Sequence, residues 1–329
     1  MYQALCVARQ NRNLKQGSLF LLLLTMTLLL AISDGHAASS VKSKLAEKSL
    51  LLDVVCTDSL VVTVGERGHI LRSEDSGDSW QQVVVPTRAT LTGLFFYDRQ
   101  LGWAVGHDQV ILRTRDAGKS WQQVFSAPEE ESPLLDVWFA DAEHGYAIGA
   151  YGRFLETLDG GETWESRWIS EDDYHLNKMF AVGSSLFIAA EAGTVYRSDN
   201  GGQDWLTITT PYEGSFFGGI ALDRSRLLIF GLRGHLYRSD DLGETWSMIS
   251  SKTESSLNSG LLLNDGKIVI AGLAGSVLVS RDGSASFMFR KLEDRQGIAA
   301  ICQAEDGSIV AVGESGVTLL STELPDLRK

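Results

Sequence analysis

Carboxylates recur at a regular spacing along this chain, and they are the residues whose chemistry has to be considered first. They belong to the motif Ser/Thr-x-Asp-x-Gly-x-x-Trp, whose copies begin 41 to 43 residues apart at Ser73, Thr114, Thr157, Ser198, Ser239, Ser280 and Ser321. Carboxylates can bind a metal ion or act as general acids, but both roles need oxygens that converge on one point. Copies spread evenly over a repeat architecture do not converge. We therefore interpret these carboxylates as structural.

Each copy of the motif, called an Asp box below, is expected to form a turn that satisfies its own hydrogen bonds. The Asp carboxylate can accept N–H groups of the same turn, and the Gly supplies a left-handed residue. The large Trp can pack between neighbouring repeats, and Asn and Phe replace Asp and Trp once each. The predicted structural residues are Asp75, Trp80, Asp116, Trp121, Asp159, Trp164, Asn200, Trp205, Asp241, Trp246, Asp282 and Phe287.

A pair of glycines separated by two residues precedes each Asp box by eight residues. The first pair is Gly65-x-x-Gly68, and the pattern departs from glycine at Gln109 in the second copy and Ala190 in the fourth. Runs rich in β-forming residues flank the pairs, which indicates hairpin turns. With one further apolar strand, each unit of about 41 residues holds the four strands of a propeller blade. The sequence predicts an all-β fold, a seven-bladed β-propeller over residues 50–322.

The segments outside the repeats have separate predicted roles. Residues 1–37 have a basic start, an apolar run from Leu19 to Ile32 and small residues near Ala37, which indicates a cleaved secretory signal peptide. A membrane anchor is the alternative, but a span needs about 20 apolar residues. Residues 38–49 are predicted to supply the outer strand of the last blade and close the ring, and residues 323–329 to form a tail. The mature protein is then expected to be a periplasmic monomer that does not insert into the membrane.

Composition restricts the partners. The chain has 29 Lys and Arg against 42 Asp and Glu, a formal charge of −13, whereas a nucleic-acid-binding protein needs a basic stripe. The six histidines are dispersed and no metal-binding motif occurs, so no metal or cofactor is predicted. Cys56 and Cys302 fall in the first strands of the first and last repeats. A disulfide is permitted in an oxidising compartment, but bonded Cα atoms lie within about 7 Å, and we expect two free thiols instead.

Partner binding is predicted on the loops opposite the Asp boxes, because loops on a rigid ring are its variable part. The stretch from Pro211 to Gly218 mixes aromatic residues with glycine, which suits a protein-contact surface. The alternative is that Phe216 or Phe217 belongs to the core. The candidate partner-binding residues are Arg67, His69, His107, Tyr151, Arg153, Tyr174, Tyr212, Phe216, Arg233 and His235.

The longer register of the repeats resembles the photosystem II stability and assembly factor family. The two segments that carry the resemblance are LLDVWFADAEHGYAIGAYGRFLETLDGGETW at 134–164 and TGLFFYDRQLGWAVGHDQVILRTRDAGKSW at 92–121. The resemblance covers residues 50–322. It implies a non-catalytic lumenal or periplasmic propeller that binds a membrane protein intermediate. Relatives in non-photosynthetic bacteria often occur beside transporters of the resistance-nodulation-division type. The positive patch of the photosystem factors has no clear counterpart in this acidic sequence.

A glycan-binding or glycan-hydrolysing propeller is the alternative, because Asp boxes also occur in sialidases. A sialidase needs three converging arginines, a Tyr nucleophile, an Asp acid and an early Arg-Ile-Pro-type motif, which is missing here. No carboxylate pair, nucleophile elbow or Cys/His pair stands out either. We therefore predict a non-catalytic scaffold for a membrane protein complex, either a photosystem or a transporter.

Overall fold

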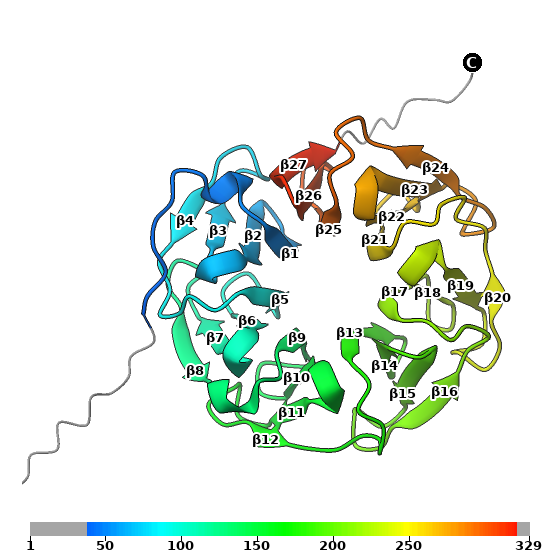
Figure 1. Cartoon of the computed structure of the whole chain (residues 1–329), viewed down its shortest axis with the longest axis horizontal. Helices are drawn as coiled ribbons and strands as arrows, with labels where there is room; N and C mark the ends of the chain where they lie inside the picture. Colours follow the sequence, from blue (N-terminus) through cyan, green and yellow to red (C-terminus); the bar gives the residue numbers. More distant parts are fainter. Residues whose placement is uncertain (1–37, 321–329) are drawn as a thin grey trace, which may run out of the picture. The chain divides into compact units, whose positions relative to one another are not determined.

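The computed structural model describes residues 38–320, which form the ring of blades in Figure 1. The predicted signal peptide and residues 321–329, where the seventh Asp box begins, lie outside the described residues. Six sheets have four strands and one has three, and neighbouring strands are antiparallel and follow sequence order within each sheet. Each repeat therefore folds as one blade. The predicted all-β seven-bladed propeller is confirmed.

Consecutive strands of the chain build the blades one after another. Blade one has β1 (Leu51–Thr57), β2 (Leu60–Gly65), β3 (Ile70–Ser73) and β4 (Gln81–Val83), and blade two has β5 (Leu91–Phe96), β6 (Gly102–Gly106), β7 (Ile111–Thr114) and β8 (Gln122–Phe125). Blade three has β9 (Leu134–Phe139), β10 (Gly145–Gly149), β11 (Phe154–Thr157) and β12 (Glu165–Ser166), and blade four has β13 (Leu176–Val182), β14 (Ser185–Ala190), β15 (Thr194–Ser198) and β16 (Leu206–Thr209). Blade five has β17 (Phe216–Ala221), β18 (Leu227–Gly231), β19 (Leu236–Ser239) and β20 (Ser247–Met248). Blade six has β21 (Leu257–Leu262), β22 (Ile268–Gly272), β23 (Ser276–Ser280) and β24 (Met288–Lys291), and blade seven has β25 (Ile298–Gln303), β26 (Ile309–Gly313) and β27 (Gly316–Leu320).

Short 3-10 turns complete the secondary structure of residues 38–320. Five of them join the second and third strands of a blade: η2 (Glu66–Gly68), η3 (His107–Gln109), η5 (Ala150–Gly152), η6 (Leu232–Gly234) and η7 (Leu273–Gly275). Two lie in connecting segments: η1 (Ala46–Lys48), before the first blade, and η4 (Pro128–Glu130), between blades two and three.

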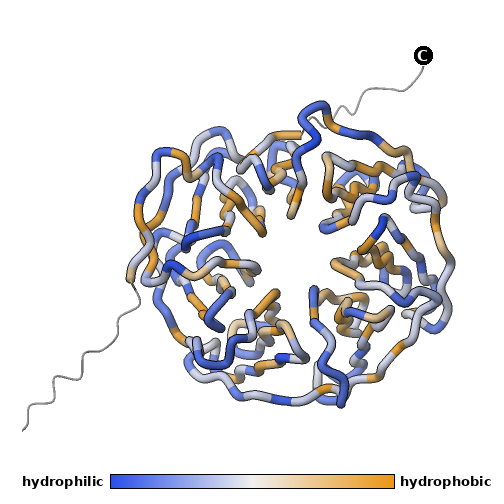
Figure 2. The backbone as a smooth tube through the Cα atoms, in the orientation of Figure 1, coloured by the Kyte–Doolittle hydropathy of each residue, from blue (hydrophilic) through white to orange (hydrophobic). Residues whose placement is uncertain are grey.

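The hydrophobic core lies between blades. Every residue of the second strands β2, β6 and β10 is buried, because both faces of these strands are covered by neighbouring blades. The outer strands β12 and β20 are short and exposed. Figure 2 shows this distribution, with hydrophobic segments in the strands and hydrophilic segments in the loops at the rim. Each blade is thus held by its two neighbours.

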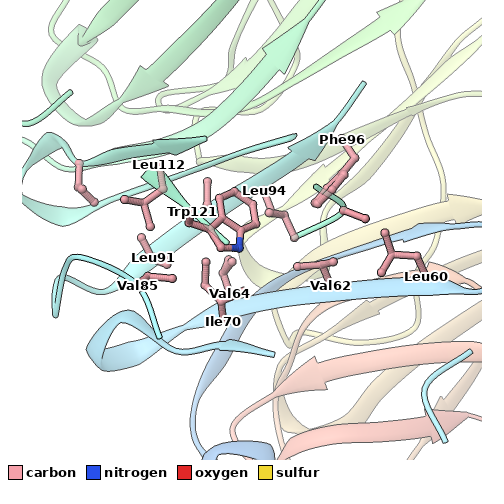
Figure 3. Close-up of a cluster of buried hydrophobic side chains, with 13 residues drawn as sticks. Leu60, Val62, Val64, Ile70, Val85, Leu91, Leu94, Phe96, Leu112 and Trp121 are labelled. Carbon is pink, nitrogen blue, oxygen red and sulfur yellow. The ribbon is translucent and has the colours of Figure 1, made fainter. Parts of the chain in front are cut away.

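The Asp-box aromatic residues pack into these boundaries. In the cluster of Figure 3, Trp121 of blade two lies against Val62 and Val64 of blade one and is only 7% exposed. Arginines of the preceding blade also reach the Asp box: Arg72 Nε donates to the carbonyl of Ala117 at 2.6 Å. Each Asp box therefore joins its own blade to the preceding one.

The Asp boxes contain the hydrogen bonds that the sequence predicts. In blade one, Asp75 Oδ1 accepts the N–H of Ser79 at 2.9 Å, and Ser73 Oγ accepts the N–H of Gly77 at 2.9 Å. Hydrogen bonds from the hydroxyls of Ser73 and Ser79 lower the pKa of Asp75 to about 2. In blade four, Asn200 Oδ1 accepts the N–H of Asp204 at 2.9 Å in the same way. The carboxylates are occupied by their own turns.

The N-terminal segment does not close the ring as predicted. Residues 38–49 form no strand, and blade seven has three strands among the described residues. The segment lies on blade one instead, where Ser40 N–H donates to the carbonyl of Val85 at 2.8 Å and Arg88 Nε to that of Ser39 at 2.9 Å. Ala46 packs between blades one and seven. The prediction of an outer strand is therefore wrong, because polar groups beside β4 hold this segment.

A covalent bond joins the two ends of the ring. Cys56 of β1 and Cys302 of β25 form a disulfide, with their Cα atoms 5.7 Å apart. The expectation of two free thiols is wrong. Blades one and seven are side by side in Figure 1, and their innermost strands pack in one cluster, which brings the two cysteines within bonding range.

We predict that reducing the Cys56–Cys302 disulfide lowers the thermal stability of the ring. The bond spans 246 residues of sequence and restricts the unfolded chain strongly, and loss of a native disulfide typically costs about 2–5 kcal/mol. Thermal unfolding with and without dithiothreitol measures the effect. The double variant Cys56→Ser/Cys302→Ser should melt like the reduced protein and not respond to the reductant. An unchanged Tm after complete reduction, verified by thiol titration, contradicts the prediction.

We also predict that Asp75→Ala lowers the Tm more than Asp75→Asn. Ala removes the acceptor for the N–H of Ser79, whereas Asn retains it, as Asn200 does in blade four. Asp78→Ala is the matched control in the same turn, because the side chain of Asp78 is not hydrogen-bonded to residues 38–320. Circular dichroism melts of the three variants provide the comparison. Equal Tm values for Asp75→Ala and Asp78→Ala would contradict this account of the turn.

Candidate functional site

The ring has two different faces. The N–H of Gly152, in a glycine-bounded turn, donates to the carbonyl of Tyr174 in the loop that leads to the next blade, at 2.9 Å. The N–H of Ser76, in an Asp box, donates to the carbonyl of Ser59 in the turn between the first two strands, at 3.0 Å. The glycine turns and the blade-to-blade loops therefore share one face, the turn face, and the Asp boxes share the other, the box face. This agrees with the predicted placement.

The glycine turns share a geometry that places one side chain at the tip of each turn. The first glycine is required by close packing, since a Cβ on Gly65 would lie 2.2 Å from the carbonyl oxygen of Leu50. The second, Gly68, has a φ of +69°, and the residue before it, Arg67, is also left-handed with a φ of +56°. This residue forms the tip of the turn. The tip residues of η2, η3, η5, η6 and η7 are Arg67, Asp108, Tyr151, Arg233 and Ala274.

The predicted partner-binding residues separate into three groups by exposure. The exposed ones are Arg67, His107, Tyr151 and Arg233, and the half-buried ones are Arg153, Tyr174, Tyr212 and His235. His69 is 4% exposed and Phe216 is 0% exposed. The side chain of Phe216 cannot meet a partner at the surface, so its assignment to the binding surface is wrong. His69 lines a cleft, and its role in binding stays a prediction. Phe216 begins β17 and belongs to the core, whereas Phe217 is half-buried.

Tyr212 is part of an aromatic stack on blade five. Its ring lies 3.9 Å from the ring of His235, and its hydroxyl donates to the carbonyl of Leu232 at 3.1 Å. The edge of Phe216 packs against it, and burial raises the pKa of the Tyr212 phenol. Arg233 and His235 also line a surface hollow of about 460 Å³. Tyr212 is therefore held rigidly beside an exposed arginine.

Gln109, which sequence reasoning did not single out as functional, organises the turn face between blades two and three. Its side chain is fully buried, and its backbone is left-handed with a φ of +47°. Gln109 Nε2 donates to Ser132 Oγ at 2.7 Å, and Gln109 Oε1 accepts from Arg153 Nε at 2.9 Å. Arg153 is thus positioned by a side chain from the preceding blade. The signal in the sequence was the replacement of the second glycine of the pair.

An ion cluster in the inner strands was likewise not predicted from the sequence. Lys178 Nζ lies 2.8 Å from Asp136 Oδ1 and 3.7 Å from Asp53 Oδ2. Asp53 also accepts the N–H of Leu94, and Asp136 that of Met179. Burial alone would lower the pKa of Lys178, but the two carboxylates outweigh it and raise that pKa. The cluster joins blades one to four. The sequence could have revealed it, because a charged residue stands at the third position of three largely apolar inner strands.

His69 lines a cleft between the N-terminal segment and blade one. The cleft has a volume of about 410 Å³, and its cationic walls include Lys42, Arg67 and Arg88. His69 Nδ1 is buried and has no hydrogen-bond partner among the described residues. Burial lowers the pKa of His69, Arg67 adds to this effect and Glu66 opposes it. His69 is therefore a neutral, buried group at neutral pH.

Residues 38–320 hold neither a cluster of potential metal ligands nor a membrane-spanning helix. No group of three or more His, Cys, Asp or Glu side chains in this range is arranged to hold a metal ion. No helix in the same range combines the length and the apolar character needed to cross a membrane.

The ring of blades and the hydrogen-bonded Asp boxes define an Asp-box β-propeller. Comparison with protein families then identifies the family of propellers to which the chain belongs. The chain belongs to the family described as "Photosynthesis system II assembly factor YCF48", whose model matches residues 71–133 and 126–321. The resemblance seen in the sequence is confirmed. No curated protein matches the chain in sequence.

Solved structures share the fold at low sequence identity. The structure "YCF48 bound to D1 peptide" is 19% identical, with a TM-score of 0.67 over 83% of this chain and 93% of that chain. "YCF48 from Cyanidioschyzon merolae" is 18% identical, with a TM-score of 0.64 over 86% and 98%. "Crystal structure of WD40 beta propeller domain of Doa1" is 16% identical, with a TM-score of 0.69 over 88% and 96%. These similarities establish the propeller fold.

We predict that His69 makes the protein less stable in mild acid. Its pKa in the folded protein lies below the ordinary value of about 6.5, so the unfolded chain takes up the proton first. The stability that neutral His69 provides is complete above about pH 6.5 and is lost as the pH falls below it. Between about pH 8 and about pH 5, the Tm should fall less steeply for His69→Gln than for the wild type. The exposed His107→Gln is the control, and identical slopes for all three proteins contradict the prediction.

Proposed function

We propose that this protein is a non-catalytic periplasmic scaffold that binds a membrane protein complex through its turn face and assists its assembly. The observation that supports this proposal is a rigid ring whose turn face presents arginine and tyrosine side chains at the tips of its turns. Arg67, Tyr151 and Arg233 each sit on a backbone held by glycines. Arginine and tyrosine dominate binding energy at protein interfaces, and a rigid support limits the entropy lost on binding.

The family supports the same conclusion. A related structure is described as YCF48 bound to a D1 peptide, so a propeller of this family takes up a peptide. The client of this protein is proposed to be a membrane protein complex, either a photosystem or a transporter of the resistance-nodulation-division type. The chain acts as a monomer in this role.

A periplasmic location is supported by two independent features. The first is the secretory signal pattern that the sequence shows in residues 1–37. The second is the disulfide between Cys56 and Cys302, because disulfides persist in oxidising compartments such as the bacterial periplasm. Both favour a site of action beyond the inner membrane.

The absence of catalysis is supported by the way the carboxylates are used. Asp53 and Asp136 pair with Lys178 and accept backbone N–H groups, so their carboxylate oxygens already have partners within the ring. The Asp-box carboxylates accept hydrogen bonds from their own turns, which lowers the pKa of Asp159 and Asp282 to about 2. A carboxylic acid with such a pKa is ionised at neutral pH and cannot donate a proton.

The experiment is a pull-down of the tagged protein from detergent-solubilised membranes of its host, read by mass spectrometry. We expect enrichment of one inner-membrane complex. The variant Arg67→Glu/Arg233→Glu reverses two charges on the turn face and should capture that complex at least about tenfold less well. Arg115→Glu/Lys119→Glu makes the same charge change on the box face and should capture it normally. No enriched membrane complex, or equal loss in both variants, would overturn the proposal.

A further inference from the structure

Blade three carries a small polar pocket at the outer edge of the turn face. Its volume is about 260 Å³, and its lining includes Glu130, Ser132, Tyr151, Arg153, Ser166 and Trp168. These residues come from the segment before β9, from turn η5 and from the end of β12. Carboxylate, guanidinium, hydroxyl and aromatic groups therefore surround one cavity.

The pocket is supported by a strained residue of the preceding blade. Gln109 occupies the position that is glycine in the other six turns, yet it keeps a left-handed backbone with a φ of +47°. Its buried side chain holds Ser132 at 2.7 Å and Arg153 at 2.9 Å, two residues that line the pocket. Left-handed conformations of non-glycine residues persist where the surroundings enforce them, and they cluster at functional sites. A glycine at this position would give the easier turn but would leave Arg153 without this anchor.

Arg153 is held along one side and keeps a donor free. Its Nε donates to Gln109, and its Nη1 donates to Ser166 Oγ at 3.2 Å. Nη2 of Arg153 has no partner among residues 38–320. A guanidinium fixed in this way is suited to pair with a carboxylate, because little freedom remains to be lost.

An aromatic surface lies beside this guanidinium. Trp168 is 78% exposed, the highest value for a large hydrophobic side chain in residues 38–320. Tyr151 is 60% exposed, and its ring lies 4.9 Å from that of His175. His175 Nδ1 lies 2.8 Å from Glu191 Oε1, so the support under Tyr151 is itself anchored. An indole in water beside an ordered polar cavity lacks the partner that would cover it.

We propose that this pocket binds a carboxylate-bearing saccharide unit, an interaction beyond the proposed capture of a membrane complex. The apolar C–H face of a sugar ring packs on the indole of Trp168, and the hydroxyls bond to Glu130 and Ser132. The sugar carboxylate pairs with Arg153, in a charge-assisted hydrogen bond. A volume of about 260 Å³ is below that of sites for drug-sized ligands, which restricts the ligand to a small unit such as one ring. Most of this lining is polar, which suits a ligand that carries several hydroxyl groups.

The test is isothermal titration of the full protein with acidic saccharides. The probes are oligogalacturonate, oligoguluronate and a glycan fragment that contains N-acetylmuramic acid, each paired with its methyl ester. We expect at least one acid to bind and its uncharged ester to bind at least about tenfold more weakly. Failure of all three acids to bind overturns the proposal.

Variants locate the binding. Trp168→Ala and Arg153→Gln should each weaken it at least about tenfold, and Trp168→Tyr should retain most of it. Gln109→Gly tests whether Gln109 positions Arg153, and it should weaken binding of the acid but not binding of the ester. Met248→Ala and Arg233→Ala are controls from blade five and should bind like the wild type. Binding that is unaffected by Trp168→Ala and Arg153→Gln overturns the proposed site.

Two outcomes separate this proposal from the scaffold role. Saccharide binding that survives in Arg67→Glu/Arg233→Glu, while membrane capture is lost, supports both proposals as distinct activities. Binding of an acidic peptide that depends on Trp168, with no binding of any saccharide, assigns the pocket to protein recognition and overturns the saccharide proposal.

Discussion

Every blade of this propeller is apolar on both faces, so each one depends on a neighbour at either side. At most of these boundaries, hydrogen bonds also join the innermost strands of the two blades. Each of these ties is formed between a side chain at the second or third position of one strand and a backbone group of the next. Those side chains are Asp53, Thr92, Asp136, Asn177, Asn258 and Ser259. At the boundary between blades seven and one, the disulfide takes the place of such a tie. Ring closure is thus the condition on which the turn face and its sites depend.

The sequence predicts what every repeat shares, because spacing and turn chemistry are local properties. Blade number, Asp boxes and the two faces follow from the recurring motif. Ring closure did not follow, since the distance between Cys56 and Cys302 exists only once all blades have packed. Phe216 could have been assigned correctly by aligning the repeats, because its counterparts Leu51, Leu91, Leu134, Leu176, Leu257 and Ile298 are all apolar.

The features that distinguish this propeller lie at the positions where its repeats differ. The tips of the turns change from Arg67 to Tyr151 to Ala274 while the backbone beneath them stays the same. Gln109 is the sharpest departure, because it keeps the conformation that glycine would adopt freely and uses its side chain to hold Arg153. No pattern in a single sequence foretells the hydrogen-bond partners of such a residue. Its place as an exception among the glycine pairs, however, is visible in the sequence alone.

The disulfide has a consequence for the route by which the ring comes apart. A chain bonded between its first and last blades behaves as a circle, so its ends cannot peel away from each other. The earliest opening of the oxidised protein is then displaced to an interior boundary. Blades five and six meet without a tie from the inner strand, since Phe217 and Gly218 of β17 offer no polar side chain. Oxidation therefore alters the unfolding path as well as the equilibrium, from fraying at the termini to opening at an interior boundary.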